Sequence, residues 1–144
     1  MNEHTDADQD SRLEAATRVY AVMRHLVLES DDRRGEVAEA LGMSFGRSKA
    51  LRALAAGPMR MSELTAKLTT DKPYTTLIVD DLERRGLVVR SVHPEDRRSK
   101  IVTVTAAGTA AAAVAEEILA RPPARMLALD AEELAALERT IAKL

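Results

Sequence analysis

The feature that most constrains the fold is a change of hydrophobic period within residues 61–105. Apolar residues recur every three to four positions, first through Met61, Leu64 and Leu68 and then along residues 72–85. After residue 86 the chain becomes rich in Val, Ile and Thr, which favour extended strands. The segment therefore predicts two helices followed by a β-hairpin.

Sequence signals mark the boundaries of the second helix. Asp71 is suited to cap its start, and Pro73 falls in the first turn, where a missing N–H costs little. Gly86 stands where a helix often ends in the left-handed conformation. The periodicity predicts that the inward-facing residues are Thr75, Ile78, Val79 and Leu82.

The hairpin is predicted from residues 87–92 and 101–105, which flank the turn-forming segment HPEDRRSK. Two helices joined by a tight turn and followed by a basic hairpin form a winged helix-turn-helix. In that motif the second helix enters the DNA major groove. The predicted fold class is mainly α with a small β-hairpin wing, flanked by N- and C-terminal dimerisation helices.

This segment resembles the MarR family of winged helix-turn-helix transcriptional regulators. The resemblance is carried by SELTAKL, VDDLERRGLVVR, the PEDRR turn and the TAAG that follows the second strand. The most specific part is Asp96-Arg97-Arg98 followed by Thr105-x-x-Gly108. With the helices before and after, the resemblance spans nearly the whole chain. It implies a dimeric DNA-binding regulator that often responds to a small molecule.

Two residues depart from the family pattern. Family members often have Arg or Lys at the position of Leu77 and a small polar residue at that of Tyr74. Base contacts known for the family therefore do not transfer to these two positions.

Charge is unevenly distributed along the 144 residues. Residues 47–101 hold 12 Lys and Arg against 7 Asp and Glu, a net +5, whereas the remainder carries −7. A basic winged-helix segment suits binding to phosphates, although a solvated mixed-charge surface remains the alternative. The aromatic residues Tyr20, Phe45 and Tyr74 are too few to stack many bases, which favours duplex DNA over single strands or RNA.

The length and the first residues set further limits. We expect a single domain with helical extensions, divided into a disordered tail (1–10), a helical dimerisation region (11–30 and 109–144) and a winged helix-turn-helix DNA-binding domain (31–108). The acidic start MNEHTDADQD resembles neither a signal peptide nor a membrane anchor, which predicts a cytoplasmic protein. The chain has no cysteine, so thiol-based sensing is excluded.

Both ends carry helices with an apolar face. Ser11 and Glu14 predict a capping box for the first of these helices, and Asp130 with Glu133 predicts one for the last. Such faces need a partner, and two at opposite ends suggest an intertwined homodimer; a monomer that folds both helices back on itself is the alternative. The residues expected at the dimer interface are Leu13, Tyr20, Met23, Ile118, Leu134, Leu137 and Ile141.

Nothing in the sequence predicts catalysis, a metal site or a cofactor. The histidines are scattered, and no Gly-rich phosphate loop follows a strand. The adjacent pairs Asp80-Asp81 and Glu116-Glu117 point about 100° apart on a helix, which does not suit a general acid/base pair. We therefore expect a protein that is not an enzyme.

The candidate DNA-binding residues lie at the start of the second helix and on the wing. Thr76 and Lys72 are expected at base edges, Arg97 or Arg98 in a minor groove, and Tyr74 either at a phosphate or packed on a neighbouring helix. Asp96 is expected to orient a wing arginine, and Asp80 to pair with Arg90. The full candidate set is Ser62, Lys72, Pro73, Tyr74, Thr76, Leu77, Arg90, Arg97, Arg98 and Lys100.

These observations predict a ligand-responsive transcription regulator, expected to act as a repressor, that binds pseudo-palindromic duplex DNA as a homodimer. Its expected partners are duplex DNA, a second copy of the chain and a small-molecule effector. The alternative is a dimeric winged-helix protein-interaction module that does not bind DNA.

Overall fold

The computed structural model describes residues 3–28 and 32–144, which form two compact units. One unit comprises residues 33–121, and the other combines residues 1–32 with 122–144. The elements are α1 (Glu3–Leu28), α2 (Arg33–Leu41), α3 (Phe45–Ala55), β1 (Met59–Arg60), α4 (Met61–Lys67), α5 (Lys72–Arg84), β2 (Val88–Val92), β3 (Lys100–Val104), α6 (Ala106–Ala120), α7 (Ala124–Leu127) and α8 (Ala131–Ile141).

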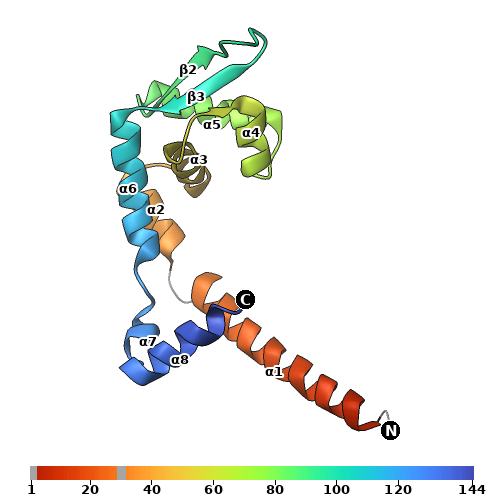
Figure 1. Cartoon of the computed structure of the whole chain (residues 1–144). Coiled ribbons are helices and arrows are strands. Elements are labelled where there is room, and N and C mark those ends of the chain that lie inside the picture. The colour runs from red at the N-terminus through yellow and green to blue at the C-terminus, as the bar shows by residue number, and fades with distance from the viewer. Residues whose placement is uncertain (1–2, 29–31) are drawn as a thin grey trace. The chain divides into compact units, whose positions relative to one another are not determined.

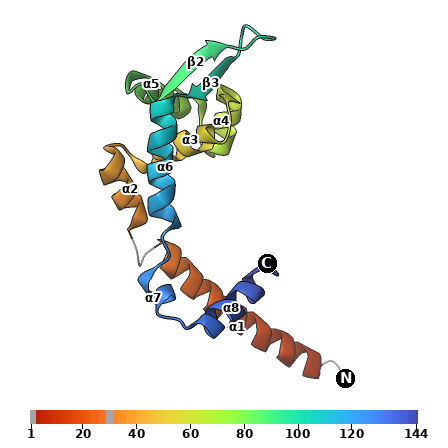
Figure 2. The same ribbon diagram turned by 60° about the vertical axis from the view of Figure 1, so that its left-hand side comes forward.

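Residues 33–121 form the winged helix-turn-helix expected from the sequence. Strands β2 and β3 are an antiparallel hairpin, with Val88 opposite Val104, and its tip projects away from α3 and α6 in Figure 1 and Figure 2. The short strand β1 pairs with the other edge of β3, giving the order β1-β3-β2. We did not predict β1, because a two-residue strand has no period of its own and depends on a partner distant in sequence.

One core holds the helix-turn-helix against the sheet. Helices α3, α4 and α5 contribute most of it, and the buried strand residues Val88 and Val102 close it from the sheet side. The buried members of this core are Met43, Ala50, Leu51, Leu54, Leu64, Ile78, Val79, Leu82, Val88, Val102 and Ala112.

Helix α6 packs on α2 and α3, and both views in Figures 1 and 2 draw it beside α2. Its cap is Thr105, whose side chain accepts a hydrogen bond from the Gly108 N–H, so it begins three residues before the predicted residue 109. Ile118 is only 9% exposed and packs with Val37 and Ala115. The prediction of Ile118 as a dimer contact is therefore wrong: the sequence shows an apolar position, but not which helix covers it.

Helix α1 begins earlier than the sequence signals suggest. Glu3 to Asp10, predicted to be disordered, are helical, and Ser11 lies inside α1 instead of capping it. Extending an existing helix costs far less than nucleating one, which explains why a polar segment continues the helix. Residues 1–2 and 29–30 of the predicted tail and helix lie outside the described residues.

Helix α8 confirms the predicted capping box. The Asp130 side chain accepts from the Glu133 N–H at 2.8 Å, and the Glu133 carboxylate accepts from the Asp130 N–H at 3.0 Å. The four-residue helix α7 before it was not predicted, because it is shorter than the window in which a helical period can be read.

The unit that contains α1, α7 and α8 leaves its apolar side chains uncovered. Among its described residues none is buried. Of the predicted dimer contacts, Leu13 is 66% exposed, Tyr20 64%, Leu134 37% and Ile141 44%, whereas Met23 and Leu137 are half-buried. Within residues 3–28 and 32–144, no helix is sufficiently long and apolar to cross a membrane.

Candidate nucleic-acid interface

The helix-turn-helix is built as its sequence signals predict. The Asp71 carboxylate accepts from the Tyr74 N–H at 2.8 Å, and Pro73 lies in the first turn of α5. Gly86 follows α5 with φ of +73°, a conformation that glycine adopts without strain. The four predicted inward residues are all buried. Thr75 also contacts α4 through its hydroxyl, which lies 2.8 Å from the Thr65 hydroxyl, and this contact helps to fix the angle between the two helices.

The start of α5, the start of α4 and the wing surround one open groove of about 500 Å³. Helix α5 contributes Lys72 and Thr76 to its wall. Of the ten candidate DNA-binding residues, the groove brings together Ser62, Lys72, Thr76, Arg90, Arg98 and Lys100. Its other lining residues, not among the sequence-based candidates, are Arg60, Met61, Thr65 and Ser99.

The groove is electrostatically one-sided. Five of its lining residues are Arg or Lys and none is acidic. A concave surface lined with a single sign of charge concentrates the opposite charge, here an anion. Arg60 was missed because it belongs to β1, and only the pairing of Arg60 with Ile101 brings it beside the wing.

Four candidates do not line the groove. Pro73, Leu77 and Arg97 are exposed elsewhere on the surface. Tyr74 lies against α3, because its hydroxyl oxygen is 3.0 Å from where a side chain at Gly46 would begin. This contact favours the packing role for Tyr74 over the phosphate role.

Arg90 is held by carboxylates of its own chain. Its guanidinium lies 2.6 Å from the Asp80 carboxylate, as predicted, and 3.2 Å from that of Glu83. The hydrogen bond to Glu83 raises the pKa of Arg90, and the bond from Arg90 lowers the pKa of Glu83. Because these carboxylates offset its positive charge, Arg90 attracts a phosphate less strongly than Arg98 or Lys100 does.

Asp96 shapes the wing through its backbone. Its carboxylate accepts from the Arg98 N–H at 3.1 Å and from the Ser99 hydroxyl at 3.2 Å. Asp96 therefore orients a wing arginine, as predicted, and it does so through the main chain at Arg98.

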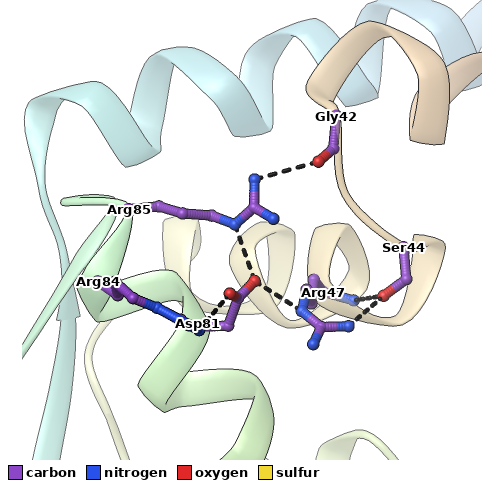
Figure 3. Close-up of polar contacts among 6 residues, drawn as sticks. All are labelled: Gly42, Ser44, Arg47, Asp81, Arg84 and Arg85. Atoms are coloured by element: carbon purple, nitrogen blue, oxygen red, sulfur yellow. Dashed lines mark hydrogen bonds and ion pairs between the residues drawn. The ribbon is translucent and has the colours of Figure 1, made fainter.

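Asp81 is the centre of a polar cluster that joins α5 to α3 (Figure 3). Its carboxylate lies 2.7 Å from Arg47, 2.6 Å from Arg84 and 2.8 Å from Arg85. Arg85 also donates to the Gly42 carbonyl at 3.1 Å, and Arg47 donates to the Ser44 hydroxyl at 2.9 Å. Asp81 is 9% exposed and its carboxylate is engaged within the protein, so it does not face a DNA phosphate.

The Asp81 cluster predicts a specific dependence of stability on pH. The hydrogen bond from Arg85, with a further one from Arg47, holds the pKa of Asp81 below its ordinary value of 3.8. A carboxyl whose pKa is lower in the folded state stabilises the fold above the unfolded pKa and loses that contribution as pH falls through the folded pKa. Asp81→Asn should therefore lower the thermal midpoint at neutral pH and flatten its fall below about pH 4.

Thermal unfolding followed by circular dichroism across that range measures both effects. Asp80→Asn is the matched control, because Asp80 is 52% exposed and contacts Arg90 alone among the ion pairs of the described residues. Equal midpoints for the two variants at every pH would contradict the assignment.

The segment that forms the groove resembles a known protein family. The model of the MarR family matches residues 51–100, from α3 through the wing to the first residue of β3. Over this segment the chain is similar to the MarR family. This match covers the segment that forms the groove.

A curated protein also resembles part of the chain. The chain is 38% identical over 74 residues to the uncharacterised HTH-type transcriptional regulator YfiV of Bacillus subtilis (strain 168). That match covers 49% of this chain, and it spans only 46% of the length of the relative.

Two solved MarR-type structures share the fold. Wild-type MarR of E. coli in its apo form superposes with a TM-score of 0.71 at 24% identity, over 85% of this chain and 93% of that one. The S. aureus MepR–DNA complex gives a TM-score of 0.61 at 17% identity, over 88% and 98%. At these identities the superpositions concern the fold.

Proposed function

We propose that this chain is a non-enzymatic transcription regulator of the MarR type that binds a pseudo-palindromic duplex operator as a homodimer. The observation that carries the proposal is the groove in which Lys72 and Thr76 of α5 lie beside Arg98 and Lys100 of the wing, with no acidic residue in the wall. The similarity of fold to the MepR–DNA complex supports it. Such a regulator acts on the chromosome, so cytoplasmic localisation belongs to the same proposal.

The two elements of the groove have different roles in the proposal. Thr76, one turn into α5, faces base edges and supplies sequence preference. Its hydroxyl donates to the Lys72 carbonyl at 3.0 Å, so the hydroxyl oxygen retains its lone pairs as acceptors. Arg98 and Lys100 contact phosphates or the minor groove and supply affinity that does not depend on sequence.

Recognition by a dimer sets the spacing of the operator. A two-fold dimer presents its α5 helices to successive major grooves on one face of the duplex, so the half-sites should lie about 10 bp apart. A small molecule that binds and favours another dimer geometry would release the DNA. The proposed protein is therefore a ligand-responsive repressor.

Two substitutions test the proposal by the kind of energy that each removes. Arg98→Ala should weaken binding to operator and to unrelated duplex alike and reduce the slope of log K against log salt by about 1. Thr76→Ala should weaken operator binding by about 1 to 3 kcal/mol and leave binding to unrelated duplex unchanged. Fluorescence anisotropy in a salt series, with both duplexes, measures these effects once footprinting has located an operator.

The same titrations discriminate the alternative. A wild-type chain that binds no duplex DNA, even at low salt, would contradict the proposal and favour a winged-helix interaction module. Lys49→Met, on the exposed face of α3 outside the groove, serves as the control for loss of one positive charge.

A further inference from the structure

Arg60 and His93 face each other where the wing joins the body of the domain. Arg60 ends β1, His93 follows β2, and an Arg60 guanidinium nitrogen lies 3.0 Å from His93 Nε2. The main-chain N–H of His93 donates to the Ser99 carbonyl at 2.9 Å and joins the two strands at the base of the wing. Both side chains are half-buried, and within residues 3–28 and 32–144 no ion pair engages Arg60.

The two nitrogens at this contact are both hydrogen-bond donors. A guanidinium has only donors, so Arg60 needs an acceptor at Nε2. The Glu95 N–H, however, donates to His93 Nδ1 at 3.1 Å, so Nδ1 has no proton of its own. The neutral ring must then carry its proton on Nε2, and the two nitrogens are both donors.

Two donors that meet without an acceptor need an atom that accepts from both. An anionic oxygen satisfies this requirement and forms charge-assisted hydrogen bonds with the guanidinium. Arg60 lines the basic groove with Arg98, Ser99 and Lys100, so an oxygen placed there lies on the surface already assigned to DNA. A carboxylate satisfies the same two donors, but a row of cations along a groove matches the repeated charge of a duplex backbone.

We propose that Arg60 and His93 together bind one phosphate group of duplex DNA at the root of the wing. This inference rests on the proposed function and adds to it a contact that does not depend on sequence. Arg60 supplies the charge, and neutral His93 supplies a second, directional hydrogen bond. Because the His93 main chain is bonded to Ser99, the phosphate also fixes the wing relative to the helix-turn-helix.

Salt titrations of variants test the site. Arg60→Met should weaken binding to operator and to a duplex of arbitrary sequence by the same factor, about tenfold, and reduce the salt slope by about 1. His93→Phe keeps the ring but loses the donor, so it should weaken both complexes with little change of slope. The double variant should lose less than the product of the two single losses, because both groups bind one phosphate.

The controls separate this site from the proposed function. Lys49→Met removes a charge outside the groove, and thermal midpoints verify that each variant is folded. If Arg60→Met matches Lys49→Met in affinity and slope while Arg98→Ala loses both, the phosphate site is wrong and the proposed function stands. If the wild-type chain binds no duplex, both fail. Inorganic phosphate is also added to the wild-type chain without DNA. If phosphate raises its thermal midpoint while Arg60→Met and His93→Phe bind duplex DNA as the wild type does, the pair is a free-anion site and the DNA contact is overturned.

The tautomer of His93 gives a second test that does not involve DNA. Long-range ¹H–¹⁵N correlation spectra of the free protein, at a pH where the ring is neutral, should show the proton on Nε2, with the signal assigned by its loss in His93→Phe. A proton on Nδ1 would overturn the proposal, because Nε2 would then accept directly from Arg60.

Discussion

Replacing Gly108 with alanine should destabilise the chain by about 3 kcal/mol or prevent it from folding. A Cβ at this position would lie 2.0 Å from the Leu87 carbonyl oxygen and 2.6 Å from a methyl carbon of Val104. The carbonyl belongs to the backbone, so it cannot rotate away as a side chain would. Relief of the clash would require α6 to move off the start of β2.

The contacts around Gly108 make such a movement costly. The Thr105 hydroxyl donates to the Gly86 carbonyl at 2.7 Å, and the Thr105 N–H donates to the Leu87 carbonyl at 3.0 Å. Lifting α6 to admit a methyl group would stretch both bonds and separate Ala112 from the core. This geometry explains the Thr105-x-x-Gly108 motif: the threonine caps α6, and the glycine allows the helix to approach the sheet.

Urea unfolding followed by circular dichroism measures the effect. The control is Ala107→Gly, which changes the neighbouring exposed position of the same turn and should cost about 1 kcal/mol or less. If Gly108→Ala unfolds at the same urea concentration as the wild-type chain, the close approach of α6 to Leu87 does not exist.

The elements that could be predicted from sequence are those whose signals are local. Asp71, Pro73 and Gly86 act on the chain within one turn of themselves, so the bounds of α5 followed from them. The capping box of α8 is equally local, with Asp130 and Glu133 three residues apart. Local signals also placed the hairpin, because its turn and its two strands are continuous in sequence.

The features that could not be predicted depend on contacts between distant residues. Asp81 is bonded to Arg47, which lies 34 positions earlier, and the sequence alone showed only an acidic residue on a DNA-reading helix. Arg60 reaches the groove because β1 pairs with β3, and His93 meets it from 33 positions away. Ile118 is an apolar residue near the end of a helix, which the sequence alone cannot distinguish from an interface residue; in the structure α2 covers it.

Placing aspartate at Leu134 and Ile141 should convert a dimer into a monomer and weaken operator binding by about 100-fold or more. The two side chains lie one heptad apart on the same face of α8 and are 37% and 44% exposed. Together with Leu13, Val19 and Tyr20 of α1, they belong to a unit that has no buried residue among those described. Apolar surface of this extent needs a partner, and we propose that a second copy of the chain supplies it.

The effect on DNA follows from linking two binding units. In a dimer, once one α5 is bound the second binds as an intramolecular event, which raises the overall affinity by about 10² to 10⁴. A monomer retains the groove but loses this gain, so its affinity for a single half-site should remain near that of one subunit of the dimer.

Sedimentation equilibrium at micromolar concentration measures the oligomeric state, and anisotropy titrations on full and half operators measure the affinity. The control is Glu138→Asp with Arg139→Asp, which also alters two positions of α8 but on its exposed polar face. A Leu134→Asp, Ile141→Asp variant that still sediments as a dimer would show that α8 does not form the interface, and a wild-type chain that sediments as a monomer would reject the dimer itself.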